Sequence, residues 1–473
     1  MSSSAALLFL IRHLRRGFAA RIAMSATDRA KTLRTLIGML NDASEVVIKE
    51  WEAEERGPIN TTPEQTRLAS PAMFEARRII SGACGMFLDI TQEPTTRLTE
   101  VANSFFLSRA LHIAAKAKIA DVLSNVDENE GLLVDIIAMK VGINAQKLTR
   151  VLRTLCTIHI FREVKPYHFA HSPTSRVMID NEYLRCWLLL HAMEIYSATD
   201  KLFDLLFDPV KTNSYNPRES AWQEATGDNL LPYEYLEQHV ERPDGSVGPR
   251  PQLDIWSHAM VGVGRASAAA MYADYPWEAL GCGTLVDVGG GVGGTCLDLS
   301  RKFPNLRLVV QDRLETIRKA ETIWMHEYPE AIQTGRVRLV AHDFFAPQPI
   351  RDADVYFLRY VLHDWPDDEC VAILAHLREA MKPDSMVLVA DHVIHPTAGS
   401  AYLKSAPSPL PPNYGSAHQF ENTHDLAMMA THNAMERTPE MLEAVAVRAG
   451  LHVIKIWECR GGIGVTELRR DVA

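Results

Sequence analysis

A glycine-rich turn and a nearby acid are the first residues of the sequence that suggest chemistry. The segment TLVDVGGGVGG contains Gly289-x-Gly291-x-x-Gly294 directly after an apolar run that predicts a buried strand. Glycines let the backbone pass close to a ligand, and Asp312, at the end of the next apolar run, can accept hydrogen bonds from both hydroxyls of a ribose. The pattern predicts a nucleotide-type cofactor, and taken alone it fits NAD, FAD or S-adenosylmethionine.

Two further acids favour the last of these cofactors. Asp287 stands two residues before the first glycine, where it would repel a dinucleotide pyrophosphate and attract the cationic amino-acid tail of S-adenosylmethionine. Asp343 ends the third apolar run, where it can accept from an adenine amino group while Phe344 stacks on the ring. The alternative is a glycine-rich packing turn flanked by solvated acids.

His363 is the candidate for a general base. It lies in DVYFLRYVLHDWPDDEC, where a buried run ends and Pro366 with three acids predicts the first turn of a helix. A histidine at such a strand end can take a proton from a substrate hydroxyl near neutral pH. The alternative is a structural histidine.

A cluster of histidines and one acid follows between residues 392 and 432. Two histidines and a carboxylate from such a set can hold iron, but the residues lack tight ligand spacing, so we predict no metal site. The methionines of DLAMMATHNAM fit either an apolar pocket or plain core. The cluster consists of His392, His395, His418, His424, Asp425 and His432.

The elements that must position these residues follow from the apolar pattern. After residue 281 the sequence alternates between continuous apolar runs and helical segments, which is typical of parallel strands covered on both faces. We predict a doubly wound, Rossmann-like α/β sheet over residues 281–473, with its ligand at the carboxyl ends of the strands. The predicted strands are TLVDV, LRLVV, VRLV, DVYFLRYVL, SMVLVADHVI and LHVIKIWE.

Helical patterns precede this domain. Residues 96–190 give helices, a helix-turn-helix and the hairpin FREVKPYHFAHS, which is the order of a winged helix. Its cations Lys147, Arg150 and Arg153 fit DNA binding, whereas the acidic balance of the whole chain favours a packing or dimerisation module. Residues 191–280 predict a helical linker interrupted by ERPDGSVGPRPQ, and residues 1–95 a partly helical extension.

Composition narrows the function classes. The 473 residues include 49 Lys and Arg against 59 Asp and Glu, a formal charge of −10 that argues against nonspecific nucleic-acid binding. The seven scattered cysteines contain no CxxC pair, so we expect no disulfide framework and a reducing compartment. No apolar run approaches the roughly 18 residues of a membrane helix.

The first 27 residues carry four arginines and no acid before Asp28. Their apolar residues recur at helical spacing, which is the pattern of a mitochondrial presequence. The alternative is a tail, with Met24 as the true start. The cytoplasm is the expected compartment, and the mitochondrion is the alternative.

Three motifs taken together, DVGGG, VLHDWPDDEC and NAMERT, resemble the plant and fungal class I O-methyltransferases of the caffeate and flavonoid type, which carry a winged-helix dimerisation domain. The resemblance runs from about residue 100 to 470. It implies a homodimer that transfers a methyl group from S-adenosylmethionine to a hydroxyl of a phenolic or polyketide-type small molecule, with no metal, nucleic acid or membrane partner. The alternative is a catalytically inactive S-adenosylmethionine-binding or DNA-binding regulator.

The resemblance also implies roles for single residues. It makes His363 the base and gives Asp391 and Glu436 as the acids that orient its ring, although Asp391 is one methylene shorter than the glutamate usual there. His258, Met260 and Asn433 fall on segments that face the cofactor or the acceptor. Around the cofactor it implies Gly289, Asp312, Asp343, Phe344, Trp365 and Arg359, the last in a position usually held by lysine.

One stretch departs from the family's usual length. Residues 399–420, GSAYLKSAPSPLPPNYGSAHQF, are rich in proline and serine and form a longer connection than usual. The composition favours a tolerated surface insertion, and a lid over the acceptor is the alternative.

Overall fold

The computed structural model describes residues 25–56, 68–242 and 245–470. The arginine-rich segment of residues 1–24, and with it most of the predicted presequence or tail, lies outside the described residues. The described chain divides into two compact units. One contains the residues up to Arg97 together with 397–399 and 404–417, and the other contains 98–396, 400–403 and the residues from His418 on.

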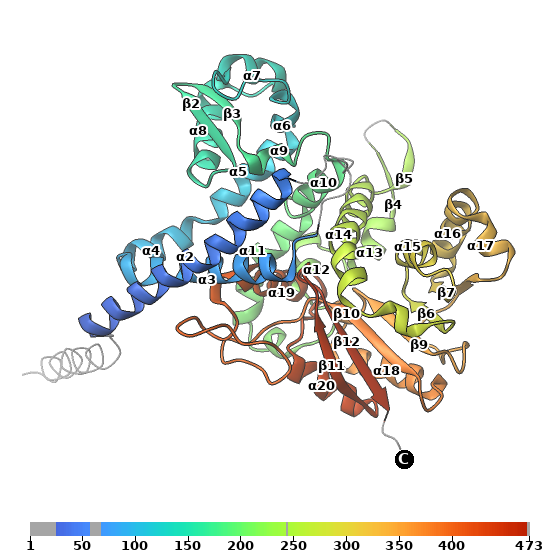
Figure 1. Cartoon of the computed structure of the whole chain (residues 1–473). Coiled ribbons are helices and arrows are strands. Elements are labelled where there is room, and N and C mark those ends of the chain that lie inside the picture. Colours follow the sequence, from blue (N-terminus) through green and yellow to red (C-terminus); the bar gives the residue numbers. More distant parts are fainter. Residues whose placement is uncertain (1–24, 57–67, 243–244, 471–473) are drawn as a thin grey trace, which may run out of the picture. The chain divides into compact units, whose positions relative to one another are not determined.

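A seven-stranded sheet forms the centre of the larger unit (Figure 1). Its strands are β6 (Thr284–Val288), β7 (Arg307–Asp312), β8 (Val337–Ala341), β9 (Val355–Arg359), β10 (Met386–Asp391), β11 (Leu451–Glu458) and β12 (Gly464–Arg470). The order is β11-β12-β10-β9-β6-β7-β8. Neighbours from β10 to β8 pair in parallel, whereas β12 is antiparallel to β10 and β11.

The prediction of a doubly wound sheet is confirmed, including its six strands. The seventh strand, β12, was not predicted, because GVTELRR is largely polar and carries no continuous apolar run. It is an antiparallel strand, and such strands tolerate this composition better than the parallel strands at the centre of the sheet do.

Helices cover both faces of the sheet because alternate strand residues are apolar on both sides. Val286, Tyr356 and Val387 share one core cluster with α18 (Asp367–Ala380) and α20 (Pro439–Arg448). Phe357 points the other way and contacts Trp277 with ring centroids 5.8 Å apart. None of the described helices is both long and apolar enough to cross a membrane. The helical elements from the end of the linker onward are η2 (Trp277–Leu280), α15 (Gly294–Lys302), α16 (Leu314–Glu327), α17 (Pro329–Gln333), η3 (Leu362–Asp364), α18 (Asp367–Ala380), η4 (Gly415–His418), α19 (Gln419–His432) and α20 (Pro439–Arg448).

The winged-helix pattern is also present. It comprises α4 (Pro94–Asn103), α5 (Phe105–Lys116), α6 (Ile119–Val122), β1 (Leu132–Leu133), α7 (Val134–Val141), α8 (Ala145–Thr157), β2 (Phe161–Lys165), β3 (His168–His171) and α9 (Pro173–Arg176). The strands form a small sheet in the order β1-β3-β2. Arg153 donates two 2.8 Å hydrogen bonds to Glu163 on the hairpin, so this cation, one of the three considered for DNA, has a partner within the domain.

The linker is mostly helical, as predicted, but its polar interruption forms a hairpin. Strands β4 (His239–Glu241) and β5 (Val247–Pro249) pair antiparallel across that stretch. Helix α10 (Glu182–Leu190) precedes the linker, whose helices are α11 (Glu194–Phe207), η1 (Lys211–Asn213), α12 (Ala221–Thr226), α13 (Pro232–Glu237) and α14 (Gln252–Asp274). Helix α10 packs against α14, and α11 and α12 pack against α19.

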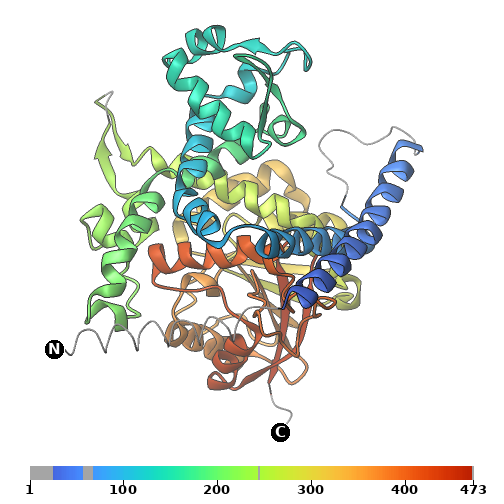
Figure 2. The same ribbon diagram turned by 90° about the vertical axis from the view of Figure 1, so that its left-hand side faces the viewer.

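The smaller unit joins the N-terminal extension to the proline-rich insertion. Helices α2 (Ala26–Arg56) and α3 (Pro71–Thr91) pack against each other (dark blue in Figures 1 and 2). Leu410 of the insertion joins Leu36 and Ala83 in one apolar cluster. Tyr414 is fully buried, and its hydroxyl donates to Glu75 Oε1 at 2.8 Å. Residues 404–417 are therefore packed on the two helices.

The contact between α3 and the insertion predicts the effect of a small substitution. A Cβ at Gly82 would lie 2.4 Å from the carbonyl oxygen of Tyr414, so Gly82→Ala should destabilise this unit by about 1–3 kcal/mol through overpacking. Gly38→Ala is the matched control, because no atom lies within 4 Å of a Cβ there. Chemical denaturation and limited proteolysis within residues 404–417 measure the difference. Equal stability and equal cleavage of the two variants would contradict the packing.

Candidate active site

Several of the acids and the arginine singled out from the sequence lie at one edge of the sheet, where the parallel strands end. Asp287 is the fourth residue of β6, and the glycine turn follows it directly. Asp312 ends β7, Arg359 ends β9 and Asp391 ends β10. Parallel strands present their carboxyl ends at the same edge, so segments as far apart in sequence as Asp287 and Asp391 contribute to one site.

The glycine turn is shaped by positive backbone angles. Gly289 and Gly291 have φ of 71° and 60°, a region that only glycine adopts without strain. A Cβ at Gly289 would lie 2.9 Å from the Val361 side chain. The amide of Gly291 donates to Asp312 Oδ2 at 2.9 Å, and the Arg313 amide donates to Oδ1 at 2.8 Å. A carboxylate can accept about four hydrogen bonds, so Asp312 keeps capacity for two hydroxyls.

Asp287 lies directly beneath this turn. It is 1% exposed, and a Cβ at Gly290 would lie 2.6 Å from its carboxyl carbon. Cys296 Sγ donates to Asp287 Oδ2 at 3.3 Å. Burial raises the pKa of Asp287 to about 6. A buried carboxylate of this kind is stabilised in its charged form by a cation at the turn.

Aromatic side chains lie beside the next acid. Phe344 and Trp365 meet edge to face with ring centroids 6.0 Å apart, and Phe345 lies 4.8 Å from Trp365. Asp343 Oδ1 accepts from the Phe345 amide at 3.0 Å. The structure thus brings Asp343, Phe344 and Trp365 together as predicted from the sequence, and it adds Phe345, which the FF pair next to Asp343 could have indicated.

Arg359 connects the linker helix α14 to the edge of the sheet through hydrogen bonds. Its guanidinium donates to Ser267 Oγ at 2.7 Å and to the Gly264 carbonyl at 2.6 Å, both on α14, and to Thr295 Oγ1 at 3.0 Å. Its buried Nε has no hydrogen-bond partner among the described residues. Arg359 also supplies a positive charge that lowers the pKa of Asp287, although burial of that carboxyl dominates.

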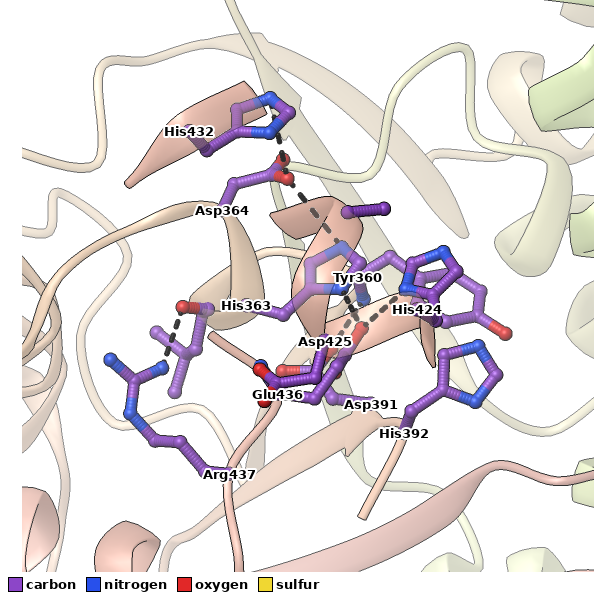
Figure 3. A network of polar contacts seen from close by, with 12 residues as sticks. Tyr360, His363, Asp364, Asp391, His392, His424, Asp425, His432, Glu436 and Arg437 are labelled. Atoms are coloured by element: carbon purple, nitrogen blue, oxygen red, sulfur yellow. Dashed lines mark hydrogen bonds and ion pairs between the residues drawn. The ribbon is translucent and has the colours of Figure 1, made fainter. Parts of the chain in front are cut away.

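His363 forms the central polar contact of the site (Figure 3). Its Nδ1 lies 2.7 Å from Oε1 of Glu436, whose side chain is fully buried. This partner assigns the Nδ1 proton to the bond and leaves Nε2 for a substrate. Burial lowers the pKa of His363, but the charges of Glu436 and Asp364 outweigh it and raise the value to about 10. Burial raises the pKa of Glu436, and His363 more than reverses that shift.

Asp391 affects the position of His363 indirectly, through the backbone of Tyr360. Its Oδ1 accepts from the Tyr360 amide at 2.8 Å, while the imidazole of His363 donates its hydrogen bond to Glu436. Tyr360 has a φ of 54°, a strained conformation for a residue other than glycine. It directs the chain from β9 into the turn that carries His363, and its ring lies 5.4 Å from the imidazole. Asp391 thus holds the strained backbone, and its charge also raises the pKa of His363.

Each residue of the ERT motif has a separate contact. Glu436 binds His363, and Arg437 donates to the carbonyls of Leu362 at 2.8 Å and Trp365 at 2.9 Å, on either side of His363. Thr438 caps α20 by accepting from the Met441 amide. Arg437 was not singled out from the sequence, because the sequence alone does not distinguish an exposed arginine from a buried one that binds backbone carbonyls.

The residues predicted near the acceptor lie on two helices. His258 and Met260 are on α14, and the His258 ring donates through Nδ1 to the Asp254 carbonyl at 2.7 Å. Asn433 caps the C-terminus of α19 with a φ of 54°, and its amide donates to the carbonyls of Ser214 and Asn216. Their contact with an acceptor stays a prediction.

Rings from several elements surround His424 close to His363. His424 lies 6.1 Å from Trp187, 5.6 Å from Phe420 and 5.3 Å from His392 between ring centroids. Within the described residues, no three His, Cys, Asp or Glu side chains are arranged to hold a metal ion. A cavity of about 10 Å³ borders His363 and Glu436. It is far smaller than the several hundred Å³ of a ligand pocket.

Two family models match the chain. Residues 270–452 match an O-methyltransferase domain, which covers most of the seven-stranded sheet and its helices. Residues 99–181 match an O-methyltransferase dimerisation domain, which covers the winged helix.

Curated relatives and solved structures match over most of their length. O-methyltransferase gedA of Aspergillus terreus is 39% identical, over 94% of this chain and 98% of its own. O-methyltransferase tpcA of Aspergillus fumigatus is also 39% identical, over 94% and 97%. The SAH-bound structure of CalO1, a methyltransferase in calicheamicin biosynthesis, shares the fold with a TM-score of 0.61 at 24% identity, over 80% of this chain and 98% of that one.

The contact between His363 and Glu436 predicts how the imidazole titrates. Removing the carboxylate charge with Glu436→Gln should lower the pKa of His363 by about 1–3 units, the usual effect of an adjacent opposite charge. NMR titration of ring-labelled histidine measures the change. Asp368→Asn is the control, because Asp368 is exposed and pairs with Arg448. An unchanged His363 titration in Glu436→Gln would refute the contact.

Proposed function

This chain belongs to the O-methyltransferase family, and we propose that it methylates a phenolic hydroxyl of an aromatic or polyketide-type small molecule with His363 as the general base. S-adenosylmethionine is the methyl donor. The observation that carries the proposal is the 2.7 Å contact between Nδ1 of His363 and the buried Glu436, which leaves Nε2 for the acceptor.

The sheet edge fits this donor. Asp287 under the glycine turn suits a cationic amino-acid tail, and Asp312 keeps two acceptor positions for the ribose hydroxyls. Asp343 with Phe344 and Trp365 suits an adenine ring, which needs a hydrogen-bond acceptor and apolar faces. When bound, S-adenosylmethionine supplies a methyl group that its sulfonium already activates for in-line displacement.

His363 removes the proton from the acceptor hydroxyl. A phenol has a pKa of about 10, so little phenolate exists at neutral pH. Neutral His363 accepts the phenolic proton at Nε2, and Glu436 stabilises the imidazolium that forms. Alignment of the reacting atoms by the surrounding elements can lower the barrier by about 7–11 kcal/mol in favourable cases.

Proton release from His363 must precede this step. With its pKa raised to about 10, the imidazole holds a proton at neutral pH in the protein without ligands. A positive charge bound at the neighbouring edge lowers the pKa of a cationic group, so binding of a cationic donor favours the neutral imidazole. The rate of turnover should therefore rise with pH, because His363 loses its proton as the pH increases.

Aromatic side chains support an aromatic acceptor. Trp187 and Phe420 each contact the ring of His424, which lies 6.3 Å from the His363 ring between centroids, and these rings present flat faces. Such faces stack on planar ring systems.

Two further features belong to the proposal. We infer a homodimer through the winged helix, because the matching model is a dimerisation domain and Phe105 and Phe106 on α5 are about half exposed. All seven cysteines are free thiols, which supports a reducing compartment such as the cytoplasm.

Substitution of the base tests the catalytic role. His363→Ala should reduce kcat by about 10²–10⁴, the contribution typical of general base catalysis, while the Kd for S-adenosylmethionine changes little. Methyl transfer to a panel of phenols, read by mass spectrometry, and calorimetric titration of the donor give the two quantities. His326→Ala, on the exposed face of α16, is the control. Turnover equal to that of the unsubstituted enzyme would refute the assignment.

Substitution of Asp312 tests the donor site separately. Asp312→Ala should weaken S-adenosylmethionine binding by about 10- to 100-fold, since charge-assisted hydrogen bonds contribute about 1.5–3 kcal/mol. Glu315→Ala removes an exposed carboxylate three residues further on and should leave the Kd unchanged. Equal affinities of the two variants would remove Asp312 from the donor site.

A further inference from the structure

We propose that His424 is a second imidazole on the Glu436 carboxylate, and that by sharing this carboxylate with His363 it limits how strongly Glu436 holds a proton on the base. The inference rests on the proposed role of His363 as base and adds a positioning residue to it. In the sequence, His424 was noted only as part of the histidine cluster.

The geometry places both imidazoles at one oxygen (Figure 3). Nδ1 of His424 lies 3.2 Å from Oε1 of Glu436, and Nδ1 of His363 lies 2.7 Å from the same atom. The two rings are parallel within 1°, with centroids 6.3 Å apart. Both histidine side chains are nearly buried, at 11% and 12% exposed, and the Glu436 side chain is completely buried.

Glu436 depends on these contacts for its position. Its Oε2 is buried and has no hydrogen-bond partner among the described residues, so Oε1 carries the polar contacts of the side chain. Asp425, which follows His424 on α19, accepts from the Glu436 amide at 2.8 Å. Two neighbouring residues of one helix thus contact the main chain and the side chain of Glu436.

The ring of His424 is fixed by its packing. It lies parallel to Trp187 of α10 within 3°, with centroids 6.1 Å apart, and contacts Phe420 one turn earlier on α19. These contacts restrict the rotation of the ring, and Nδ1 lies within ion-pair distance of Glu436 Oε1 without meeting hydrogen-bond geometry. His424 therefore acts on the base through Glu436.

The electrostatic effect has a definite sign. A carboxylate oxygen that interacts with two ring nitrogens stabilises each of them less than it would stabilise one alone. Without the nitrogen of His424, Glu436 would favour the imidazolium form of His363 more strongly and hold it to higher pH. His424 therefore helps His363 to lose its proton.

The other ionisable groups around this pair come from several elements and stay unchanged in the test. Asp364 lies 3.7 Å from Nε2 of His363, and His432 faces Asp364 at 3.8 Å. Burial lowers the pKa of His392 and of His432, so both favour the neutral form. The remaining charged groups that act on the pair are Asp391, Asp425 and Arg437.

The experiment compares two substitutions of His424. His424→Phe keeps a ring against Trp187 and removes the nitrogen, whereas His424→Asn keeps an N–H close to the position of Nδ1. For each variant we measure the pH dependence of kcat/KM with saturating donor, and titrate ring-labelled His363 by NMR in the protein without ligands. Phe420→Leu, which alters the packing of His424 without removing the nitrogen, is the control.

The proposal predicts that His424→Phe moves the acid limb of kcat/KM and the His363 titration upward by about one pH unit, the size of one charge-assisted contact. His424→Asn and Phe420→Leu should leave both within a few tenths of a unit of the unsubstituted protein, whatever their effect on kcat.

Three results would overturn the inference: no shift in His424→Phe, an equal shift in His424→Phe and His424→Asn, or the same shift in Phe420→Leu. The NMR titration needs no turnover, so it tests the coupling of the two imidazoles by itself. Full activity of His363→Ala would instead refute the base, and would do so whatever the titrations show.

Discussion

The buried contact between His363 and Glu436 is the interaction on which the rest of the site depends. A carboxylate and an imidazole removed from water are costly unless they face each other in good geometry. At 2.7 Å, with Glu436 fully buried, each stabilises the charged form of the other. Much of the surrounding structure can be understood as a means of bringing these two side chains, 73 residues apart in sequence, to one place.

Separate elements hold the two ends of this contact. On the histidine side, the strained backbone of Tyr360 turns the chain out of β9, Asp391 accepts its amide, and Arg437 binds the carbonyls that flank the imidazole. On the carboxylate side, α19 supplies Asp425 to the main chain of Glu436. The strained backbone at Tyr360 persists only while these partners hold it. Loss of Asp391 or Arg437 would therefore displace His363, although neither residue contacts a substrate.

The sequence predicts those parts of the molecule that depend on local pattern. Continuous apolar runs predict the six strands, and the glycines at 289 and 291 predict a turn that the structure forms with positive φ. His363 is predictable because a strand end followed by a helix start places it at the carboxyl edge of the sheet. The ERT motif indicates a functional site, but the sequence alone does not show which contact each of Glu436, Arg437 and Thr438 makes.

The features that the sequence does not predict are those set by distant contacts. The polar strand β12 is stabilised by pairing with β10 and β11. The insertion was expected as a tolerated surface insertion, with a lid as the alternative, and its composition did not indicate that residues 404–417 pack on α2 and α3 through Leu410 and Tyr414. Asp391 was expected beside the imidazole, and its hydrogen bond goes to the Tyr360 amide instead.

The most direct test of the central claim is a crystal structure with S-adenosylhomocysteine and a phenolic acceptor. We predict the acceptor hydroxyl within about 2.6–3.2 Å of Nε2 of His363, with Nδ1 still on Glu436. A hydroxyl bound away from the imidazole, with the reacting carbon and oxygen aligned by other residues, would contradict the account.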